Sequence, residues 1–416
     1  MIRRTRTQVG RLQVAVAEIP GLRSVASLLA LDAGQLAEPR GRSGVARLTA
    51  QTLLRGTETR SAQEWSEGLD AIGASSRLDV GGQAALFSGQ CLTGDLRAYL
   101  RLVAEAVLHP ALAAAELEFV RQQALAQIEE DKKDTRAVAE KTWRELAYPP
   151  GHPFHTRAVG DEAVVRSTTT EELRRFHSDH VVGGGAVLVI AGGAGAATAI
   201  DAVNEAFAEW PAGRARPAAA AEPSVLSATV RRDVVVPDKT QCDVVLGWHG
   251  LPRKDPRYVA ARVTNMVFAA DTFASRAGNV VRDQLGLAYY VFSTLGSTRV
   301  ASPWLVRMGV NPENVTRAVG TTFEELRRIH EGDIAEDDLA LAKDKLVGEL
   351  DVALESPGGV AQLVLEAELF DLGDDHFERY PRELRAVTKD QVVETARSFL
   401  PLDRYALAVA GPPLPA

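Results

Sequence analysis

The feature of this sequence that most constrains its fold is a repeat that relates the two halves of the chain. Residues 169–173 are typical of a helix start, and a strand-like apolar run that ends at Gly192 follows. The same pattern returns at residues 388–392 and Gly411, so the helix start and the strand end are displaced by the same interval. A longer helix upstream repeats at a slightly larger interval, which aligns Leu117, Arg121 and Ile128 with Leu339, Lys343 and Leu350. Agreement at several places predicts the duplication of one domain of about 200 residues.

A proline-rich segment separates the two halves. Residues 211–223 contain three prolines and keep no hydrophobic period, so they are typical of a linker. We therefore expect an N-terminal domain at residues 1–210 and a homologous C-terminal domain at residues 224–416. A chain of 416 residues is also too long for a single hydrophobic core, which favours at least two domains.

Each half mixes helices and strands without strict alternation. Residues 95–108 place apolar side chains on one helical face, whereas residues 76–92 and 288–310 are typical of strand pairs. The short apolar run at residues 24–34 ends in glycine and predicts a buried strand. We expect an α+β fold in which each homologous domain is a mostly antiparallel sheet covered by helices on one face.

Bulk charge and hydropathy exclude some classes of protein. The net charge of −8 argues against a general nucleic-acid binder, and no apolar run is long enough to span a bilayer. The basic start of the chain is not followed by the apolar region of a signal peptide, so we expect a cytoplasmic location. Cys91 and Cys242 are isolated in the sequence and predict neither a zinc pair nor a disulfide framework.

The segment at residues 44–57 identifies a family resemblance. Gly44, Ala46, Leu53, Gly56 and Thr57 lie where the insulinase/pitrilysin family, the inverzincins, has the frame of its active-site helix. Residues 61–65 and 69–74 then resemble the next helix of that family, which ends in Gly-Ala before a strand. The resemblance covers nearly the whole chain and implies peptide hydrolysis by zinc in the active members.

The chemistry of that helix is absent from this chain. Active members of the family carry H-x-x-E-H, but here Arg47 and Gln51 stand at the two histidine positions and Ala50 at the glutamate position. The third zinc ligand of the family is a glutamate, and its place falls at or beside Gln127. Zinc needs imidazole, carboxylate or thiolate donors, and a permanently charged guanidinium repels it. We therefore expect no metal and no cofactor in this chain.

The second half keeps a different part of the family pattern. Residues 282–291 resemble the R-x6-Y segment of the family, in which Arg282 and Tyr289 have the family spacing. In active members this pair reaches the zinc site from the other homologous half or subunit. A guanidinium and a phenol are suitable donors for a substrate carbonyl and for the oxyanion it becomes. The structural alternative is that both residues only pack the end of a helix.

Other candidate sites are weaker. The pairs His177/His180 and His152/His155 lack a glutamate or cysteine spaced to complete a metal site, so we interpret them as surface or capping residues. The glycines of residues 192–195 follow an apolar strand, but Thr198 replaces the third glycine of a dinucleotide fingerprint. We interpret these glycines as structural.

The resemblance implies one function above its rivals. We expect a non-zinc-binding subunit of a heterodimeric zinc metallopeptidase, which contributes peptide binding and oxyanion stabilisation through Arg282 and Tyr289. The partner is expected to be a homologous H-x-x-E-H subunit that carries the zinc. The first rival is a purely structural or interaction member of the same family. The second rival is an independent enzyme with other chemistry, for which the sequence shows no nucleophile and base.

Overall fold

The computed structural model describes residues 3–213 and 226–415, and these residues form two compact units. Unit 1 comprises residues 1–127, 156–219 and 351–374, and unit 2 comprises residues 128–155, 220–350 and 375–416. Of the predicted linker, residues 211–213 belong to the described part of the chain, whereas residues 214–223 lie outside it. Each unit contains one sheet and its own covering helices, so the two are described in turn.

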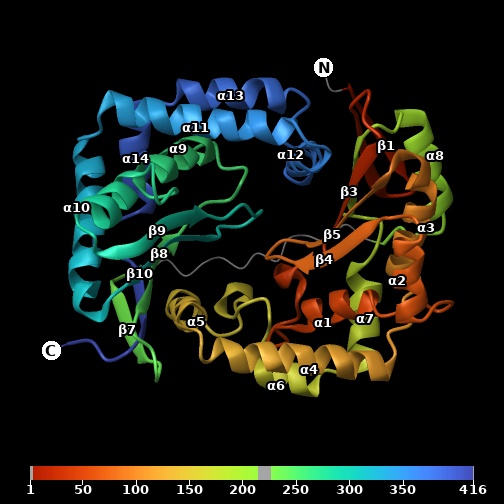
Figure 1. Cartoon of the computed structure of the whole chain (residues 1–416), viewed down its shortest axis with the longest axis horizontal. Helices are drawn as coiled ribbons and strands as arrows, with labels where there is room; N and C mark the ends of the chain where they lie inside the picture. Colours follow the sequence, from red (N-terminus) through yellow and green to blue (C-terminus); the bar gives the residue numbers. More distant parts are fainter. Residues whose placement is uncertain (1–2, 214–225, 416) are drawn as a thin grey trace. The chain divides into compact units, whose positions relative to one another are not determined.

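The sheet of unit 1 has six strands in the order β1-β2-β6-β3-β5-β4 (Figure 1). All neighbouring strands are antiparallel except β2 and β6, which are parallel. The prediction of a buried strand at residues 24–34 is confirmed by β3, and the strand pair at residues 76–92 by β4 and β5. The strands are β1 (Arg3–Val9), β2 (Leu12–Glu18), β3 (Ser24–Leu31), β4 (Ser75–Val80), β5 (Ala85–Leu92) and β6 (Val187–Gly192).

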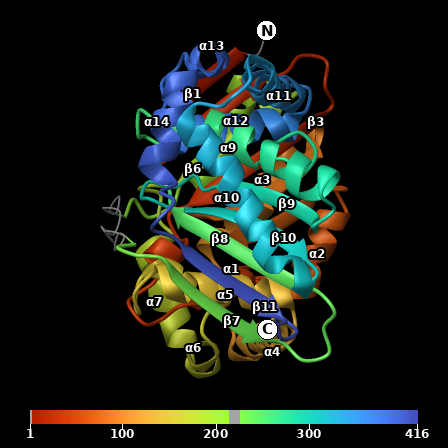
Figure 2. The same cartoon turned by 90° about the vertical axis from the view of Figure 1, so that its left-hand side faces the viewer.

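The sheet of unit 2 repeats the topology of five of those strands. Its order is β7-β11-β8-β10-β9, and only β7 and β11 are parallel. Figure 2 shows β11 between β7 and β8, as β6 lies between β2 and β3 in unit 1. The strands are β7 (Val230–Val235), β8 (Cys242–His249), β9 (Ala288–Leu295), β10 (Pro303–Val310) and β11 (Ala406–Gly411). The fold is therefore α+β with two homologous domains, as the sequence predicts.

The helices repeat at the intervals that the sequence shows. One constant shift along the chain carries α7 (Thr170–His180) onto α14 (Lys389–Phe399) and β6 onto β11. Thr169 and Thr388 cap the two helices, and each forms a capping box with the third helical residue. A second constant shift carries α5 (Thr135–Ala147) onto α12 (Pro357–Leu369), and α4 (Ala114–Asp131) onto all but the last residue of α11 (Glu336–Leu354).

The remaining helices also belong to one unit each. Unit 1 contains α1 (Val45–Leu53), α2 (Ala62–Asp70), α3 (Leu96–Leu108), α6 (Glu162–Ser167), α8 (Ala196–Phe207) and the short turns η1 (Gln35–Ala37) and η2 (Thr93–Asp95). Unit 2 contains η3 (Pro153–His155), α9 (Tyr258–Phe268), the π-helix η4 (Gly278–Gln284), η5 (Pro312–Asn314), α10 (Val315–Glu331) and α13 (His376–Ala386). The boundary between the units falls inside α4 and inside α11.

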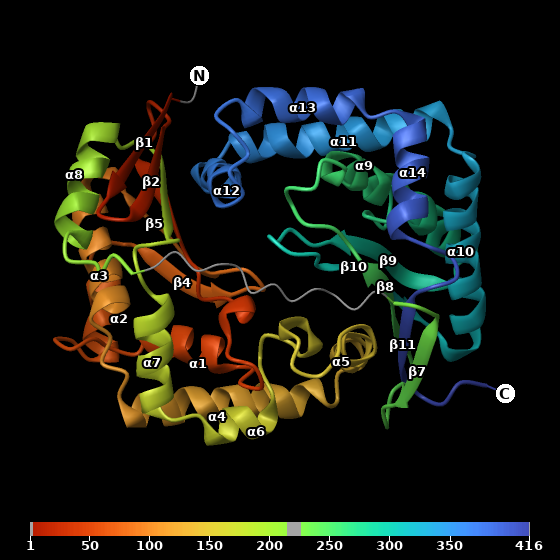
Figure 3. The same cartoon turned by 180° about the vertical axis from the view of Figure 1, so that it is seen from behind.

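The central strands of both sheets are buried on both faces. Every residue of β6 and β11 is buried, and successive side chains of a strand point to opposite faces. In unit 1, α3 and α8 cover one face and α12 packs on the other, against β2, β3 and β6 (Figure 1). In unit 2, α5 packs on β7, β8 and β11, and Figure 3 shows α10 and α14 on the opposite side of this sheet. The expectation that helices cover one face of each sheet is therefore wrong, because strands buried on both faces need a helix on the second face as well.

That second helix comes from the other half of the sequence. Helix α5 belongs to the first half and packs on the second sheet, whereas its repeat partner α12 belongs to the second half and packs on the first sheet. The division of the sequence into homologous domains at residues 1–210 and 224–416 stays a prediction, since it concerns the repeat and not the compact units. The compact units differ from them because each unit takes one helical segment, residues 128–155 or 351–374, from the other half.

Trp143 fixes α5 on its sheet. Its side chain is fully buried, and its indole N–H donates to the carbonyl of Ala406 in β11 at 3.0 Å. Gly247 of β8 provides the space, because a Cβ at that position would lie 3.0 Å from the Trp143 ring and 2.5 Å from Leu305. A large aromatic ring, a hydrogen bond and a matching gap therefore hold α5 in place.

We expect Trp143→Ala to lower the free energy of unfolding by about 3–5 kcal/mol, because it leaves a large cavity beneath α5 and an unpaired carbonyl. Lys141→Ala, on an exposed position of the same helix, should change it by no more than about 0.5 kcal/mol. Urea unfolding followed by circular dichroism measures both values. Equal effects of the two substitutions would show that α5 is not anchored by Trp143.

Candidate functional site

Helix α1 carries the first three candidate positions on one face. Arg47, Ala50 and Gln51 are three and four residues apart, a spacing that brings side chains together on a helix. Arg47 and Gln51 are half-buried, and Ala50 is 3% exposed. The three side chains present a guanidinium, a methyl group and an amide, so this face offers none of the donors that zinc requires.

The start of α1 is capped by a carboxylate that the sequence did not predict. Oε1 of Glu38 accepts hydrogen bonds from the backbone N–H groups of Gly44 at 2.7 Å and Ala46 at 3.1 Å. Burial raises the pKa of Glu38 to about 7, although these two bonds and one from Ser43 act in the opposite direction. Glu38 lies six residues before the helix cap, outside the local patterns by which caps are found in a sequence.

Two frame residues of the motif, Gly44 and Thr57, have structural roles that do not depend on zinc. Gly44 has a φ of 108°, and a Cβ there would lie 3.0 Å from the Cα of Gly160. Thr57 accepts from the Arg60 N–H at 2.9 Å and donates to Glu105 at 2.5 Å, which fixes the turn after α1. The contacts of Gly44 and Thr57 therefore do not involve the side chains at positions 47, 50 and 51.

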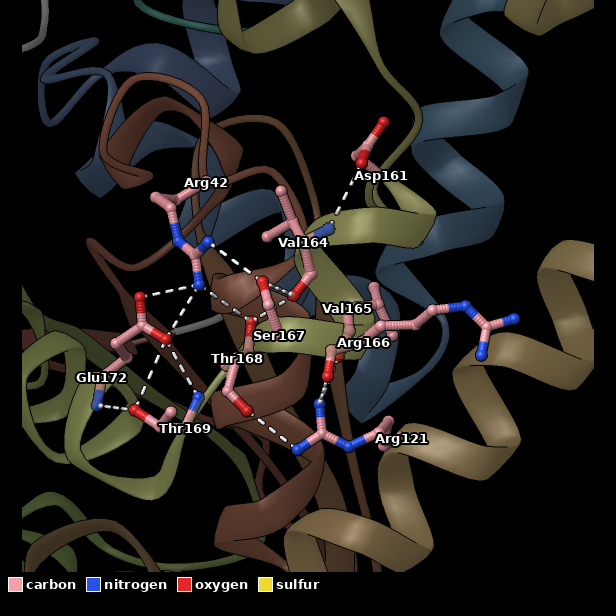
Figure 4. A network of polar contacts seen from close by, with 10 residues as sticks. All are labelled: Arg42, Arg121, Asp161, Val164, Val165, Arg166, Ser167, Thr168, Thr169 and Glu172. Carbon is pink, nitrogen blue, oxygen red and sulfur yellow. Dashed lines mark hydrogen bonds and ion pairs between the residues drawn. The ribbon is translucent and has the colours of Figure 1, made fainter.

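A polar network links the loop before α1 to α6 and α7 (Figure 4). The Arg42 guanidinium donates to Glu172 at 2.8 Å, Ser167 at 3.3 Å and Thr168 at 3.4 Å. Glu172 also accepts from the backbone N–H of Thr169, in the capping box of α7. One arginine thus fixes the approach to α1 against two helices.

Arg121 ties α4 to the same network. Its guanidinium donates to the carbonyls of Arg166 and Thr168, both at 2.8 Å, and to that of Val165 (Figure 4). These carbonyls belong to the end of α6 and the residue after it, where helix carbonyls lack partners within the helix. The sequence indicates Arg121 only as a repeat position, and its contacts show a structural role.

The fourth candidate position lies further along α4. Gln127 is exposed, as are Glu129 and Glu130 on the same helix. Among residues 3–213 and 226–415, no group of three or more His, Cys, Asp or Glu side chains is arranged to hold a metal ion. The donor set at the four motif positions does not fit zinc, because it contains one cation, one methyl group and two neutral amides.

Arg282 and Tyr289 are brought together by a β-bulge. Strand β9 lies at the edge of its sheet, and its pairing with β10 passes from Tyr290 opposite Gly309 to Ala288 opposite Val310. Tyr289 is therefore the extra residue of the bulge, and its carbonyl accepts from Nε of Arg282 in η4 at 3.0 Å. Bulges often direct a side chain at functional sites. The bulge could not be predicted from the spacing of the two residues in the sequence.

The two side chains differ in their surroundings. The Arg282 guanidinium lies 4.6 Å from the centroid of the Phe273 ring and pairs with Asp283. The Tyr289 side chain is 76% exposed and Phe273 is 70% exposed, so neither ring contributes much to the core. The hydroxyl of Tyr289 has no hydrogen-bond partner in the described part of the chain. The Tyr289 phenol is thus exposed to solvent, and the Arg282 guanidinium is held against the backbone carbonyl of the same residue.

The histidine pairs have structural contacts, but His180 is 4% exposed, which differs from the expected surface position. His177 bonds the carbonyl of Val107 at 2.8 Å, and burial lowers its pKa, while His180 stacks on Phe176. His155 bonds the carbonyl of Tyr148 at 2.7 Å, and His152 accepts from the N–H of Phe154 at 3.0 Å. The hydrogen bonds of His152, His155 and His177 use ring nitrogens that a metal would need.

The glycines after β6 also have a structural explanation. A Cβ on Gly192 would lie 2.3 Å from the carbonyl oxygen of Ser24, and one on Gly193 would lie 1.8 Å from that of Leu22. These glycines allow the backbone to approach the start of β3 closely. Close strand packing therefore accounts for a pattern that superficially resembles a phosphate-binding loop.

Two family models match the chain. One is described as "Insulinase (Peptidase family M16)" and matches residues 13–151, and the other is described as "Peptidase M16 inactive domain" and matches residues 167–346. The first covers the degenerate helix α1, and the second covers Arg282 and Tyr289. Both models belong to one family and together they span most of the chain.

Similar proteins cover nearly the full length of the chain. An uncharacterized zinc protease of Streptomyces coelicolor is 25% identical over 99% of this chain and 90% of its own length. Another uncharacterized zinc protease, from Mycobacterium bovis, is 26% identical over 99% of this chain and 93% of its own length. Among solved structures, a peptidase M16 inactive domain from Pseudomonas fluorescens has a TM-score of 0.92 at 21% identity and covers 99% of this chain and 98% of its own. A protease from Helicobacter pylori also has a TM-score of 0.92, at 16% identity, and covers 99% of this chain and 100% of its own.

The raised pKa of Glu38 predicts a pH dependence of stability. The folded protein binds this proton more tightly than the unfolded chain, whose glutamate titrates near 4.5, so stability should fall as pH rises from 4.5 to about 7. Glu38→Gln keeps an acceptor oxygen for Gly44 and Ala46 but does not titrate, so its melting temperature should fall less over this range. Glu171→Gln, at an exposed carboxylate, is the matched control and should follow the wild type. Superimposable pH profiles for Glu38→Gln and the wild type would refute this assignment.

Proposed function

Because the chain belongs to the insulinase family, peptidase family M16, we propose that it is the non-zinc-binding subunit of a heterodimeric zinc metallopeptidase. The partner is a homologous chain that carries H-x-x-E-H, and the substrate is a peptide. The observation that carries the proposal is the arrangement at β9, where Tyr289 exposes its phenol and the Arg282 guanidinium is fixed on the backbone carbonyl of Tyr289. The motif positions of α1 and α4 are unsuited to zinc, so the metal belongs to the partner.

The proposed chemistry assigns each side chain a task. The partner's zinc, when bound there, supplies the activated water of a metallopeptidase. Tyr289 donates its hydroxyl proton in a hydrogen bond to the scissile carbonyl oxygen as that oxygen becomes an oxyanion. Arg282 uses Nε to hold the Tyr289 carbonyl and one terminal nitrogen to pair with Asp283. The other terminal nitrogen of Arg282 has no hydrogen-bond partner among the described residues. It can therefore donate to the scissile carbonyl of the substrate.

The second candidate is a purely structural or interaction member of the family. The contacts of Arg282 with Tyr289, Asp283 and Phe273 favour it, because they would fix the bulge without any substrate. The exposure of Tyr289 favours the catalytic role, because a packing residue would be buried.

The cellular setting forms part of the proposal. No helix in the described ranges is long and apolar enough to cross a bilayer. With a net charge of −8 and no basic region typical of nucleic-acid binding, the chain is suited to peptides rather than nucleic acids. We assign the heterodimer to the cytoplasm.

Co-expression with an H-x-x-E-H homologue from the same genome tests the assembly. We expect a stable heterodimer on gel filtration that cleaves unstructured peptides, whereas this chain alone should hold no stoichiometric zinc and cleave none. Metal analysis and a fluorogenic peptide assay measure these properties. If the chains remain separate while the zinc chain is fully active by itself, the subunit role is excluded.

Tyr289→Phe in the assembled heterodimer tests the catalytic role. Loss of one oxyanion donor should lower kcat by about 10²–10³, with a smaller change in KM, because the bond strengthens mainly in the transition state. Steady-state kinetics on complexes purified to constant composition measure both parameters.

Tyr290→Phe is the matched control on the same strand. The Tyr290 hydroxyl donates to Asp243 and accepts from Arg136 at 3.2 Å, so its loss should lower the melting temperature and leave kcat nearly unchanged. An unchanged kcat for Tyr289→Phe in an intact heterodimer would leave only the structural candidate.

A further inference from the structure

A polar pocket in unit 2 lies between α9, α11 and β9. Its volume is about 240 Å³, and its lining includes Arg262, Asn265, Met266, Leu295, Leu346 and Glu349. It does not contain Arg282 or Tyr289, and its use would not depend on the peptidase role proposed above.

The internal repeat places this pocket at the counterpart of the degenerate motif. Helices α1 and α9 each follow the strand at the same position of its sheet, and they end at Leu53 and Phe268. Aligning these two ends matches Arg47, Ala50 and Gln51 with Arg262, Asn265 and Met266.

A pair of hydrogen bonds supports the same alignment. Thr49 donates to the carbonyl of Val45 at 2.8 Å in α1, and Thr264 donates to the carbonyl of Ala260 at 2.8 Å in α9. Aligning the helix ends places Thr264 opposite Thr49 and Ala260 opposite Val45. The alignment therefore agrees at the helix end and at an internal contact.

The fourth motif position leads to the same pocket by a separate alignment. The shift that relates α4 to α11 places Ala114 opposite Glu336, and it carries Gln127 onto Glu349, which lines the pocket. All four counterparts of the motif positions thus surround one pocket of unit 2. Unit 2 therefore has a pocket at the counterpart of the motif, lined by a different set of side chains.

Asn265 gives the pocket a fixed hydrogen-bond donor. It is only 5% exposed, and its Oδ1 accepts from the Trp304 indole at 2.7 Å and from the Ser293 hydroxyl at 2.5 Å. An indole N–H can only donate, so the amide oxygen must face Trp304 and the amide nitrogen must face away from it. That nitrogen has no hydrogen-bond partner in the described ranges, and Asn265 lines the pocket. A nearly buried amide therefore directs two N–H donors into the cavity.

The remaining lining defines the class of ligand. Arg262 adds a cation that suits a carboxylate, and Met266, Leu295 and Leu346 add an apolar wall. Glu349 adds an exposed carboxylate that suits an ammonium group. The volume is below the roughly 300–1,000 Å³ of pockets for drug-sized ligands, which favours a molecule of amino-acid size.

We propose that this pocket binds an α-carboxylate group that is attached to an aliphatic side chain. The carboxylate accepts from the Asn265 amide and from Arg262, and the side chain packs on Met266, Leu295 and Leu346. A free amino acid and a peptide C-terminus share this chemistry, and Glu349 distinguishes them because it can pair with the α-ammonium of the free amino acid.

Calorimetric titration of the full chain tests the proposal with three probes. L-leucine and Gly-Gly-Leu should bind, and L-leucinamide, which lacks the carboxylate, should not. Weaker binding of L-leucine to Glu349→Gln, with unchanged binding of Gly-Gly-Leu, would identify the free amino acid as the preferred ligand. The reverse preference would identify the peptide C-terminus. Failure of both carboxylate probes to bind at millimolar concentrations, or equal binding of L-leucinamide, overturns the proposal.

Asn265→Asp is the decisive variant. It keeps the oxygen that accepts from Trp304 and Ser293 but replaces the donor by a second acceptor, so affinity for L-leucine should fall about 10- to 100-fold. Asn279→Asp makes the same change at an exposed position and should leave the affinity unaltered. If Asn265→Asp does not fold, Arg262→Gln should show a comparable loss. Unchanged affinity in a folded variant of either residue would rule out this binding mode.

Discussion

The burial of both faces of the central strands is the constraint on which the rest of this structure depends. Strands β6 and β11 are apolar throughout, so side chains on both faces must be removed from water. In each unit, the helices from the same half of the sequence cover one face of the sheet only. Helices α12 and α5 cover the other, and each comes from the opposite half of the sequence. Each half of the sequence thus supplies one helix, α5 or its repeat partner α12, to the sheet of the other half.

The frame of the motif in α1 is held by contacts that do not involve zinc chemistry. Gly44 is required by the close approach of Gly160, and Thr57 by its bonds with Arg60 and Glu105. Neither requirement involves zinc. These contacts run through Gly44 and Thr57 and not through residues 47, 50 or 51, so the frame does not depend on the side chains at those three positions. The network of Arg42 and Arg121 in turn fixes the helices around α1.

Strand β9 contributes residues to both of the sites that we propose in unit 2. Near its start, the bulge at Tyr289 leaves a phenol exposed to solvent, and near its end Ser293 donates to the Asn265 amide oxygen, which the Trp304 indole orients. The first arrangement resembles what a partner's active site would need, and the second forms a pocket of its own. Both depend on hydrogen bonds to fixed backbone or buried groups, because only such bonds hold a donor in one direction.

The sequence by itself determined the duplication, the α+β class and the absence of zinc donors at residues 47, 50 and 51, because caps, periodicity and residue chemistry are local properties. It also predicted the elements around residues 24–34, 76–92, 95–108 and 288–310. Only the tertiary structure decided the exchange of α5 and α12, the Glu38 cap and the bulge at Tyr289. It also decided the direction of the Asn265 amide. The exchange, the bulge and the amide direction depend on partners far away in the sequence, and spacing along the chain does not record which strands and helices will meet. The Glu38 cap is closer in the sequence but lies outside the local patterns by which caps are found.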